Sequence, residues 1–67
     1  MLTSITRREQ QVIDKLCLGW TNKEVAAVLH ISPRTVEDYR TNIFKKTKVR
    51  NLVELVRLVY HIEEPAA

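Results

Sequence analysis

Four helix-start signals divide this 67-residue chain, and they constrain its fold more than any other feature. Residues 6–9 (TRRE) and 21–24 (TNKE) fit the capping box, in which a threonine hydroxyl and a glutamate three residues later each accept a free backbone amide. Ser32-Pro33 puts a capping side chain before a residue suited to the first helical position, and Asn51 begins a looser capping box. Because glycine occurs once and proline twice, short connections are expected. The chain is therefore predicted to be all-α, with four helices.

The predicted helices cover about residues 7–18, 22–29, 33–47 and 52–61. Gly19 follows the first helix and can take the left-handed conformation of a helix end. A positive φ is also expected at His30, because histidine tolerates it better than a branched residue does. At helical spacing the first three helices each direct one apolar face inward, which predicts one small core. Its expected members are Val12, Ile13, Leu16, Cys17, Val25, Ala26, Leu29, Val36, Tyr39, Ile43 and Phe44.

The predicted fourth helix is apolar over much of its circumference, which a single small core does not require. The surplus lies around Val53 and Tyr60, with Arg57 between them. A homodimer interface is the expected use of this surface. The alternative is that a small domain simply exposes a few valines. Residues 1–62 are expected to form one domain, and residues 63–67 a flexible tail.

The net charge of +3 is distributed unevenly. Residues 33–50 contain six basic and two acidic residues, a balance of +4, whereas the remainder contains five basic and six acidic residues, a balance of −1. A concentration of positive charge on one helix suits contacts with phosphates. The alternative is a basic helix that is merely solvated.

The composition argues against several classes of protein. Cys17 is the only cysteine, so an internal disulfide is excluded, and with His30 and His61 it does not make a metal site. The residues of an enzyme active site, such as a nucleophile with its base, are not present, so neither an enzyme nor a bound cofactor or small-molecule ligand is expected. Membrane-spanning and signal-peptide patterns are missing as well, which favours a cytoplasmic protein.

The second and third predicted helices have the pattern of a helix-turn-helix motif. Three residues, His30 to Ser32, separate them. Ala26 allows the two helices to approach closely, Ile31 fills the angle between them, and Val36 packs the second helix against the first.

Around this motif the chain resembles the LuxR-type (GerE-like) helix-turn-helix family, without a gap over about residues 4–62. The segments SPRTVE and ELVRL are most similar to the FixJ/NarL branch of response-regulator output domains. A helix-turn-helix pattern alone is a weak signal, but so many positions in register make a strong one. The matching positions are Ile5-Thr6, Arg8-Glu9, Val12-Ile13, Leu16, Gly19, Thr21 to Ala26, Leu29, Ile31-Ser32, Thr35-Val36, Asn42-Ile43, Lys46 and Val49.

The resemblance implies a four-helix domain of the winged-helix-like superfamily without a wing. It also implies a sequence-specific transcriptional regulator that inserts the third helix into the major groove of double-stranded DNA and dimerises through the fourth. Such domains are usually attached to a receiver or ligand-binding domain, so the chain is interpreted either as a stand-alone regulator or as an output domain. The alternative function is a protein-interaction module or anti-activator that binds another regulator or RNA polymerase through the same fold.

A helical wheel with Val36 pointing inward directs Arg34, Asp38, Thr41 and Lys45 outward, with Glu37 and Asn42 on the flanks. By the family's pattern, the residues nearest the base edges are Glu37, Asp38 and Thr41. The expected phosphate contacts, from side chains or from amides at helix starts, are Lys23, Arg34, Thr35, Tyr39, Asn42, Lys45 and Lys46. Arg40 is left open between a DNA contact and a solvated charge, and Glu9 and Asp14 are expected on the far side of the domain.

Two features do not fit this pattern simply. Glu37 and Asp38 put adjacent carboxylates on a helix expected to meet a polyanion. Three roles for them stay open: an ion pair with Arg34, a contact with a cytosine amino group, and a weakening of non-specific DNA binding. Residues 46–49 read KTKV where the family usually has Lys-Leu-Gly-Val, which predicts a less well capped end of the third helix.

Overall fold

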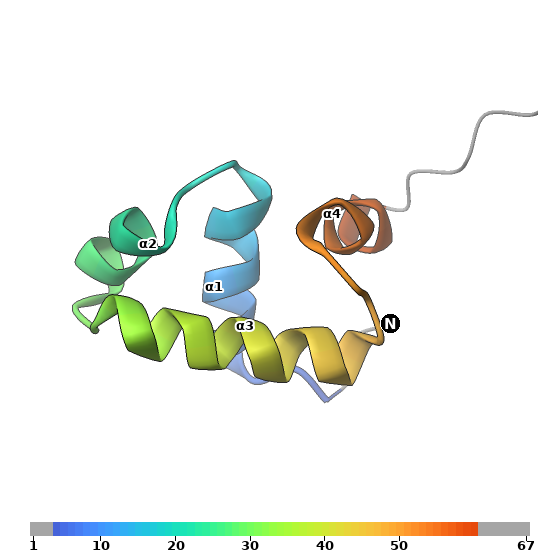
Figure 1. Cartoon of the computed structure of the whole chain (residues 1–67), viewed down its shortest axis with the longest axis horizontal. Helices are drawn as coiled ribbons and strands as arrows, with labels where there is room; N and C mark the ends of the chain where they lie inside the picture. Colours follow the sequence, from blue (N-terminus) through green and yellow to red (C-terminus); the bar gives the residue numbers. More distant parts are fainter. Residues whose placement is uncertain (1–3, 61–67) are drawn as a thin grey trace, which may run out of the picture.

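The computed structural model describes residues 4–60, which form four helices (Figure 1). These are α1 (Arg7–Cys17), α2 (Asn22–Leu29), α3 (Pro33–Thr47) and α4 (Leu52–Tyr60). The predicted all-α fold is confirmed, and strands do not occur within residues 4–60. The first helix ends one residue earlier than predicted, with Leu18 as its cap. The predicted end of the fourth helix at residue 61 and the predicted tail at 63–67 lie outside the described residues.

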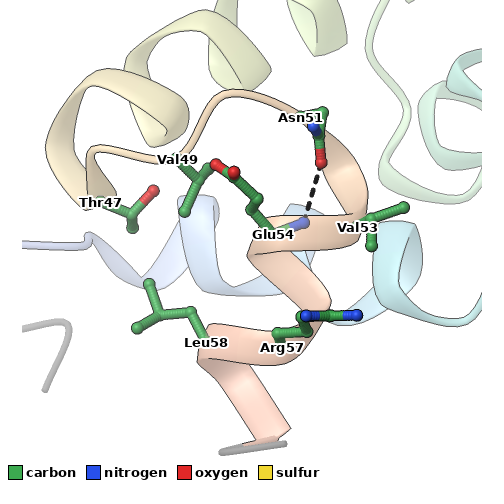
Figure 2. Close-up of a pocket in the computed structure, with 7 residues that line it drawn as sticks. All are labelled: Thr47, Val49, Asn51, Val53, Glu54, Arg57 and Leu58. Carbon is green, nitrogen blue, oxygen red and sulfur yellow. Dashed lines mark hydrogen bonds between the residues drawn. The ribbon is translucent and has the colours of Figure 1, made fainter. Parts of the chain in front are cut away.

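Side chains cap all four helix starts, and the first three are capped in the way the sequence predicts. The Thr6 hydroxyl accepts a hydrogen bond from the Glu9 amide at 3.1 Å, while the Glu9 carboxylate accepts from the Thr6 amide at 2.9 Å. Thr21 makes the same reciprocal pair at the start of α2, and the Ser32 hydroxyl accepts from the Thr35 amide at the start of α3. The looser box of α4 is half formed, because Asn51 Oδ1 accepts from the Glu54 amide at 2.9 Å (Figure 2) while the Glu54 carboxylate binds Arg50.

Three residues end helices in the left-handed conformation. Gly19 has φ 89°, and His30, as predicted, has φ 58° with its amide bonded to the Ala26 carbonyl. At the end of α3, Lys48 has φ 59°, and its amide donates to the Phe44 carbonyl. The prediction of a less well capped end is therefore wrong for the hydrogen bonds, which form without glycine. Lys48 stands where the family usually has glycine, and its left-handed conformation costs about 1–2 kcal/mol because lysine has a side chain.

The core gathers where α1 contacts each of the other three helices, and α2 and α3 also pack together. Figure 1 shows α3 lying along one edge of the molecule, with α1 behind it and α2 and α4 towards its two ends. Most predicted core residues are confirmed, although Cys17, Tyr39 and Phe44 are only partly buried. Leu55 comes from α4 and is fully buried. The buried apolar residues are Val12, Ile13, Leu16, Val25, Ala26, Leu29, Val36, Ile43 and Leu55.

Hydrogen bonds from three long basic side chains join the first three helices to one another. Arg8 of α1 donates to the carbonyl of Leu29, the last residue of α2, at 2.6 Å. Arg40 of α3 donates to Asn22 Oδ1 at the start of α2 at 3.0 Å. The third such side chain, Lys46 near the end of α3, binds a carboxylate of α1. The orientation of α3 therefore depends on polar contacts with α1 and α2 as well as on the core.

Candidate nucleic-acid interface

The outward face of α3 is polar and exposed along its length. Val36 and Ile43 are fully buried, so the opposite side of the helix faces away from the core. The residues predicted to point outward are exposed, and Thr35 and Tyr39 are half-buried at the edge. The exposed set is Arg34, Glu37, Asp38, Thr41, Asn42 and Lys45. We call this set the outward stripe of α3.

The three predicted base contacts differ in their surroundings. Asp38 forms an ion pair with Arg34 at 3.6 Å, and both side chains are largely exposed, so the pair contributes little to stability. Of the two adjacent carboxylates, only that of Asp38 has an ion-pair partner within residues 4–60. The Thr41 hydroxyl donates to the Glu37 carbonyl at 3.1 Å, which leaves its oxygen able to accept. Glu37 and Thr41 are thus the two predicted base contacts whose side-chain acceptors are not engaged with a cation.

The predicted phosphate contacts fall into an exposed and a partly engaged group. Lys23 lies exposed in the first turn of α2, and Asn42 and Lys45 lie exposed on α3. The Thr35 hydroxyl is 2.9 Å from the Ser32 hydroxyl, within the cap of α3. Tyr39 packs partly against the core, as the sequence predicts.

Lys46 has partners inside the protein. Its ammonium nitrogen lies 2.7 Å from Glu9 Oε1 and 3.1 Å from the Ser4 carbonyl oxygen. Glu9 is only 4% exposed and is bound by a lysine of α3, so the expectation that it lies on the far side of the domain is wrong. The Lys46 hydrogen bond and the Thr6 amide lower the pKa of Glu9, and burial opposes them. Two of the three N–H groups of Lys46 are engaged, and the third has no hydrogen-bond partner within residues 4–60.

Sequence reasoning missed two of these long-range contacts for the same reason. The capping box gave Glu9 a role within α1, and the helical wheel left Arg40 undecided, but their partners lie 37 and 18 residues away. Local patterns carry no information about which helix ends meet. The signal for Glu9 was a carboxylate at an otherwise apolar helix–helix contact, and it becomes visible only when the packing is known.

The surface of α4 has a different character. Val53 and Tyr60, two predicted dimer contacts, are 63% and 54% exposed, and Arg57 is exposed beside them. Figure 2 shows the helix with Thr47, Val49 and Leu58 on one side and Val53 and Arg57 on the other. These residues, with Asn51 and Glu54, line a hollow of about 730 Å³. A second hollow of about 440 Å³ lies between α4 and the end of α1, where Cys17 and Val53 are among its lining residues.

The remaining chemistry of the described residues is sparse. Burial raises the pKa of the Cys17 thiol, and the nearby Asp14 adds to this, so the thiol is held neutral. Within residues 4–60, groups of three or more metal-binding side chains do not occur. Helices long and apolar enough to cross a membrane are also missing from this range.

Two helices joined by a three-residue turn, the second lying at an edge of the molecule with a polar outward face, define a helix-turn-helix domain. Residues 3–59 match the GerE family, described as "Bacterial regulatory proteins, luxR family". The chain therefore belongs to the luxR family, and the resemblance inferred from its sequence is confirmed.

The chain is similar to several transcriptional regulatory proteins. The chain is 47% identical over 57 residues to the transcriptional regulatory protein FixJ of Azorhizobium caulinodans, covering 85% of this chain and 27% of that protein. It is 46% identical over 56 residues to the transcriptional regulatory protein UhpA of Escherichia coli, covering 84% and 29%. The crystal structure of full-length FixJ from B. japonicum superposes with a TM-score of 0.80 at 44% identity, covering 88% and 29%.

The comparisons support DNA-binding transcription regulation as the function of this family. Its members are non-enzymatic regulators, in agreement with the expectation from the sequence. The chain spans under a third of the length of the curated relatives it matches.

Proposed function

We propose that the chain binds double-stranded DNA sequence-specifically, inserting α3 into the major groove. The observation that carries the proposal is the outward stripe of α3, a continuous polar face on a helix held at the edge of the molecule. A major groove about 12 Å wide admits one such helix. Glu37, Asp38 and Thr41 then lie nearest the base edges, with Glu37 able to accept from a cytosine amino group.

The phosphate contacts we propose surround this stripe. Lys45 supplies a free ammonium, Arg34 and Asn42 supply N–H donors, and Lys46 supplies its third N–H. Lys23 and Thr35 approach the backbone from the first turns of α2 and α3, where helix amides favour anions. Tyr39, which packs partly against the core, is proposed to contribute its hydroxyl.

We also propose that two copies pair through α4, around Val53, Arg57 and Tyr60. The support is the exposed apolar surface of this helix, which a monomer leaves in contact with water. A two-fold dimer would present two copies of α3 to two half-sites about one helical turn of DNA apart. The proposed setting is the cytoplasm, where the DNA is.

A selection of bound duplexes from a random pool, followed by mobility shifts, tests this function. We expect an enriched sequence with two related half-sites, and a loss of preference at single base positions when Glu37 or Thr41 is replaced by alanine, about 1–3 kcal/mol per contact. The matched control is Asp14→Ala, which also removes an exposed carboxylate but on α1.

Two results would change the proposal. If binding is found but the same sequence is enriched by Glu37→Ala and Thr41→Ala, α3 does not read bases through these side chains. If no duplex is retained, the alternative is favoured, namely that the domain binds another regulator or RNA polymerase.

A further inference from the structure

The proposed phosphate contacts from α3 lie unevenly around that helix. At about 100° per residue from the buried Val36, four of them fall on one flank of the helix. These four are Thr35, Tyr39, Asn42 and Lys46. A helix in the major groove has a phosphate backbone on both sides, so the opposite flank of α3 needs a donor too.

Arg40 lies on that opposite flank, between the buried side and the outward stripe. It is half-buried, and its guanidinium carbon lies 5.7 Å from the centre of the Phe44 ring. Nη1 donates to Asn22 Oδ1 at 3.0 Å, in the first turn of α2. The long side chain is therefore held by a neighbouring helix and an aromatic ring, which reduces the entropy lost when it binds.

Arg40 lines an open hollow. Asn22, Glu37, Arg40, Thr41 and Phe44 line a space of about 320 Å³ between the start of α2 and α3. Two of these residues, Glu37 and Thr41, are proposed base contacts, so the hollow adjoins the reading surface. Of the five N–H donors that an arginine carries, a single one has a hydrogen-bond partner within residues 4–60.

Resting on the function proposed above, we infer that Arg40 is a phosphate-binding residue, oriented by Asn22 and Phe44 towards the DNA strand on the α2 side of the groove. Its free donors can bind one phosphate in the bidentate geometry that guanidinium favours. A cation at this position also offsets the repulsion between the Glu37 carboxylate and the same strand. Arg40 thereby allows an acidic side chain to approach the bases.

The alternative is that Arg40 only ties α3 to α2. The salt dependence of DNA affinity separates the two roles, because each phosphate contact adds about 0.9 to the slope of log affinity against log salt, whereas a tie between helices adds nothing. Arg40→Gln is the test variant, and Lys15→Gln is the control. Lys15→Gln also removes one positive charge, but in the last turn of α1, where the Lys15 ammonium lies over the Trp20 ring. Figure 1 shows this end of α1 directed away from α3.

Fluorescence anisotropy with a labelled duplex selected by the unmodified protein measures the slope between about 50 and 200 mM salt. We expect Arg40→Gln to lower the slope by about 0.9 and Lys15→Gln to leave it unchanged. Thermal unfolding followed by circular dichroism shows whether each variant is folded. If Arg40→Gln folds with a lower melting temperature but an unchanged slope, the inference is overturned. Arg40 would then only join α3 to α2.

Asn22→Asp provides a second test if Arg40→Gln does not fold. Aspartate suits the first turn of a helix, and it keeps an acceptor for Arg40, so α2 and α3 stay joined. Its charge would neutralise the guanidinium, so we expect a lower slope in Asn22→Asp. Equal slopes for Asn22→Asp and the unmodified protein would also overturn the inference. Failure of the unmodified protein to bind any duplex would instead overturn the proposed function.

Discussion

The helices α3 and α4 each bury one face, but they expose opposite kinds of surface. Val36 and Ile43 hold α3 in the core and its outward stripe is polar and charged. Leu55 holds α4, whose exposed side includes Val53, Leu58 and Tyr60. A polar stripe suits a hydrated, charged partner, whereas an apolar one is stabilised by removal from water. The comparison separates the two surfaces for which binding is proposed, and each can be altered without changing the other.

The first prediction concerns the unfolding free energy, which we expect to differ most between variants of two adjacent lysines of α3. Lys46→Ala leaves the buried carboxylate of Glu9 without its cation, and we expect a loss of about 1–3 kcal/mol in unfolding free energy. Lys45→Ala removes an exposed ammonium, and we expect a stability change within about 0.5 kcal/mol. Urea denaturation followed by circular dichroism measures both changes.

The same two variants separate a lysine proposed to serve both the fold and DNA binding, Lys46, from one proposed to serve DNA binding alone, Lys45. Lys45→Ala should lower the salt slope of DNA binding by about 0.9 while keeping the fold intact. Equal stability of the two variants would show that the Lys46–Glu9 contact contributes nothing in solution. An unchanged slope for Lys45→Ala would remove that residue from the proposed phosphate contacts.

The second prediction concerns the loss of stability at low pH that results from protonation of Glu9. Lys46 and the Thr6 amide lower the pKa of Glu9 from its usual value near 4.5, so the ionised carboxylate is favoured in the folded state. Its contribution to stability is fully present above the unfolded pKa, and it is lost as pH falls from about 4.5 through the lowered folded value. We expect the urea midpoint to fall over this acid range.

Glu9→Gln is the matched variant for this measurement, because glutamine keeps an oxygen for the Thr6 amide but does not titrate. Arg50 also lowers the pKa of the half-buried Glu54, so the unmodified protein and the variant share that part of the acid response. The difference between the two curves reports Glu9. Parallel curves from neutral pH to about pH 3 would contradict a lowered pKa at this site.

The sequence predicts those features that depend on residues close together in the chain, and it does not predict contacts between distant residues. Thr6, Thr21 and His30 behave as predicted because helix caps depend on residues three or four positions away. The outward stripe was predictable because helical periodicity needs only one buried reference residue, Val36. The contacts of Arg40 and Lys46 were not, because they depend on how separate helices pack against one another.

Lys48 shows a different limit of the same local rules. The preference for glycine at a helix end predicted a weaker cap, yet the backbone there adopts the left-handed conformation with its hydrogen bond in place. A residue's conformational preference gives the free energy of adopting the left-handed conformation. Whether the chain adopts it depends also on the packing of α3 and α4 on α1, which offsets that free energy. Glycine at this position is therefore expected to add stability and leave the fold unchanged.

The smallest expected effect on stability comes from the exposed side of α4. Val53→Asp places a charge at a position that is 63% exposed, so we expect the unfolding free energy to change by no more than about 0.5 kcal/mol. At a pairing surface the same charge would have to be buried without a partner, so the variant should sediment as a monomer at concentrations where the unmodified protein forms dimers. Leu55→Asp, on the buried side of the same helix, is the contrasting control and should unfold the domain. If Val53→Asp melts like Leu55→Asp, then Val53 belongs to the core. If the unmodified protein is a monomer both alone and on its selected DNA, the proposed pairing through α4 is wrong.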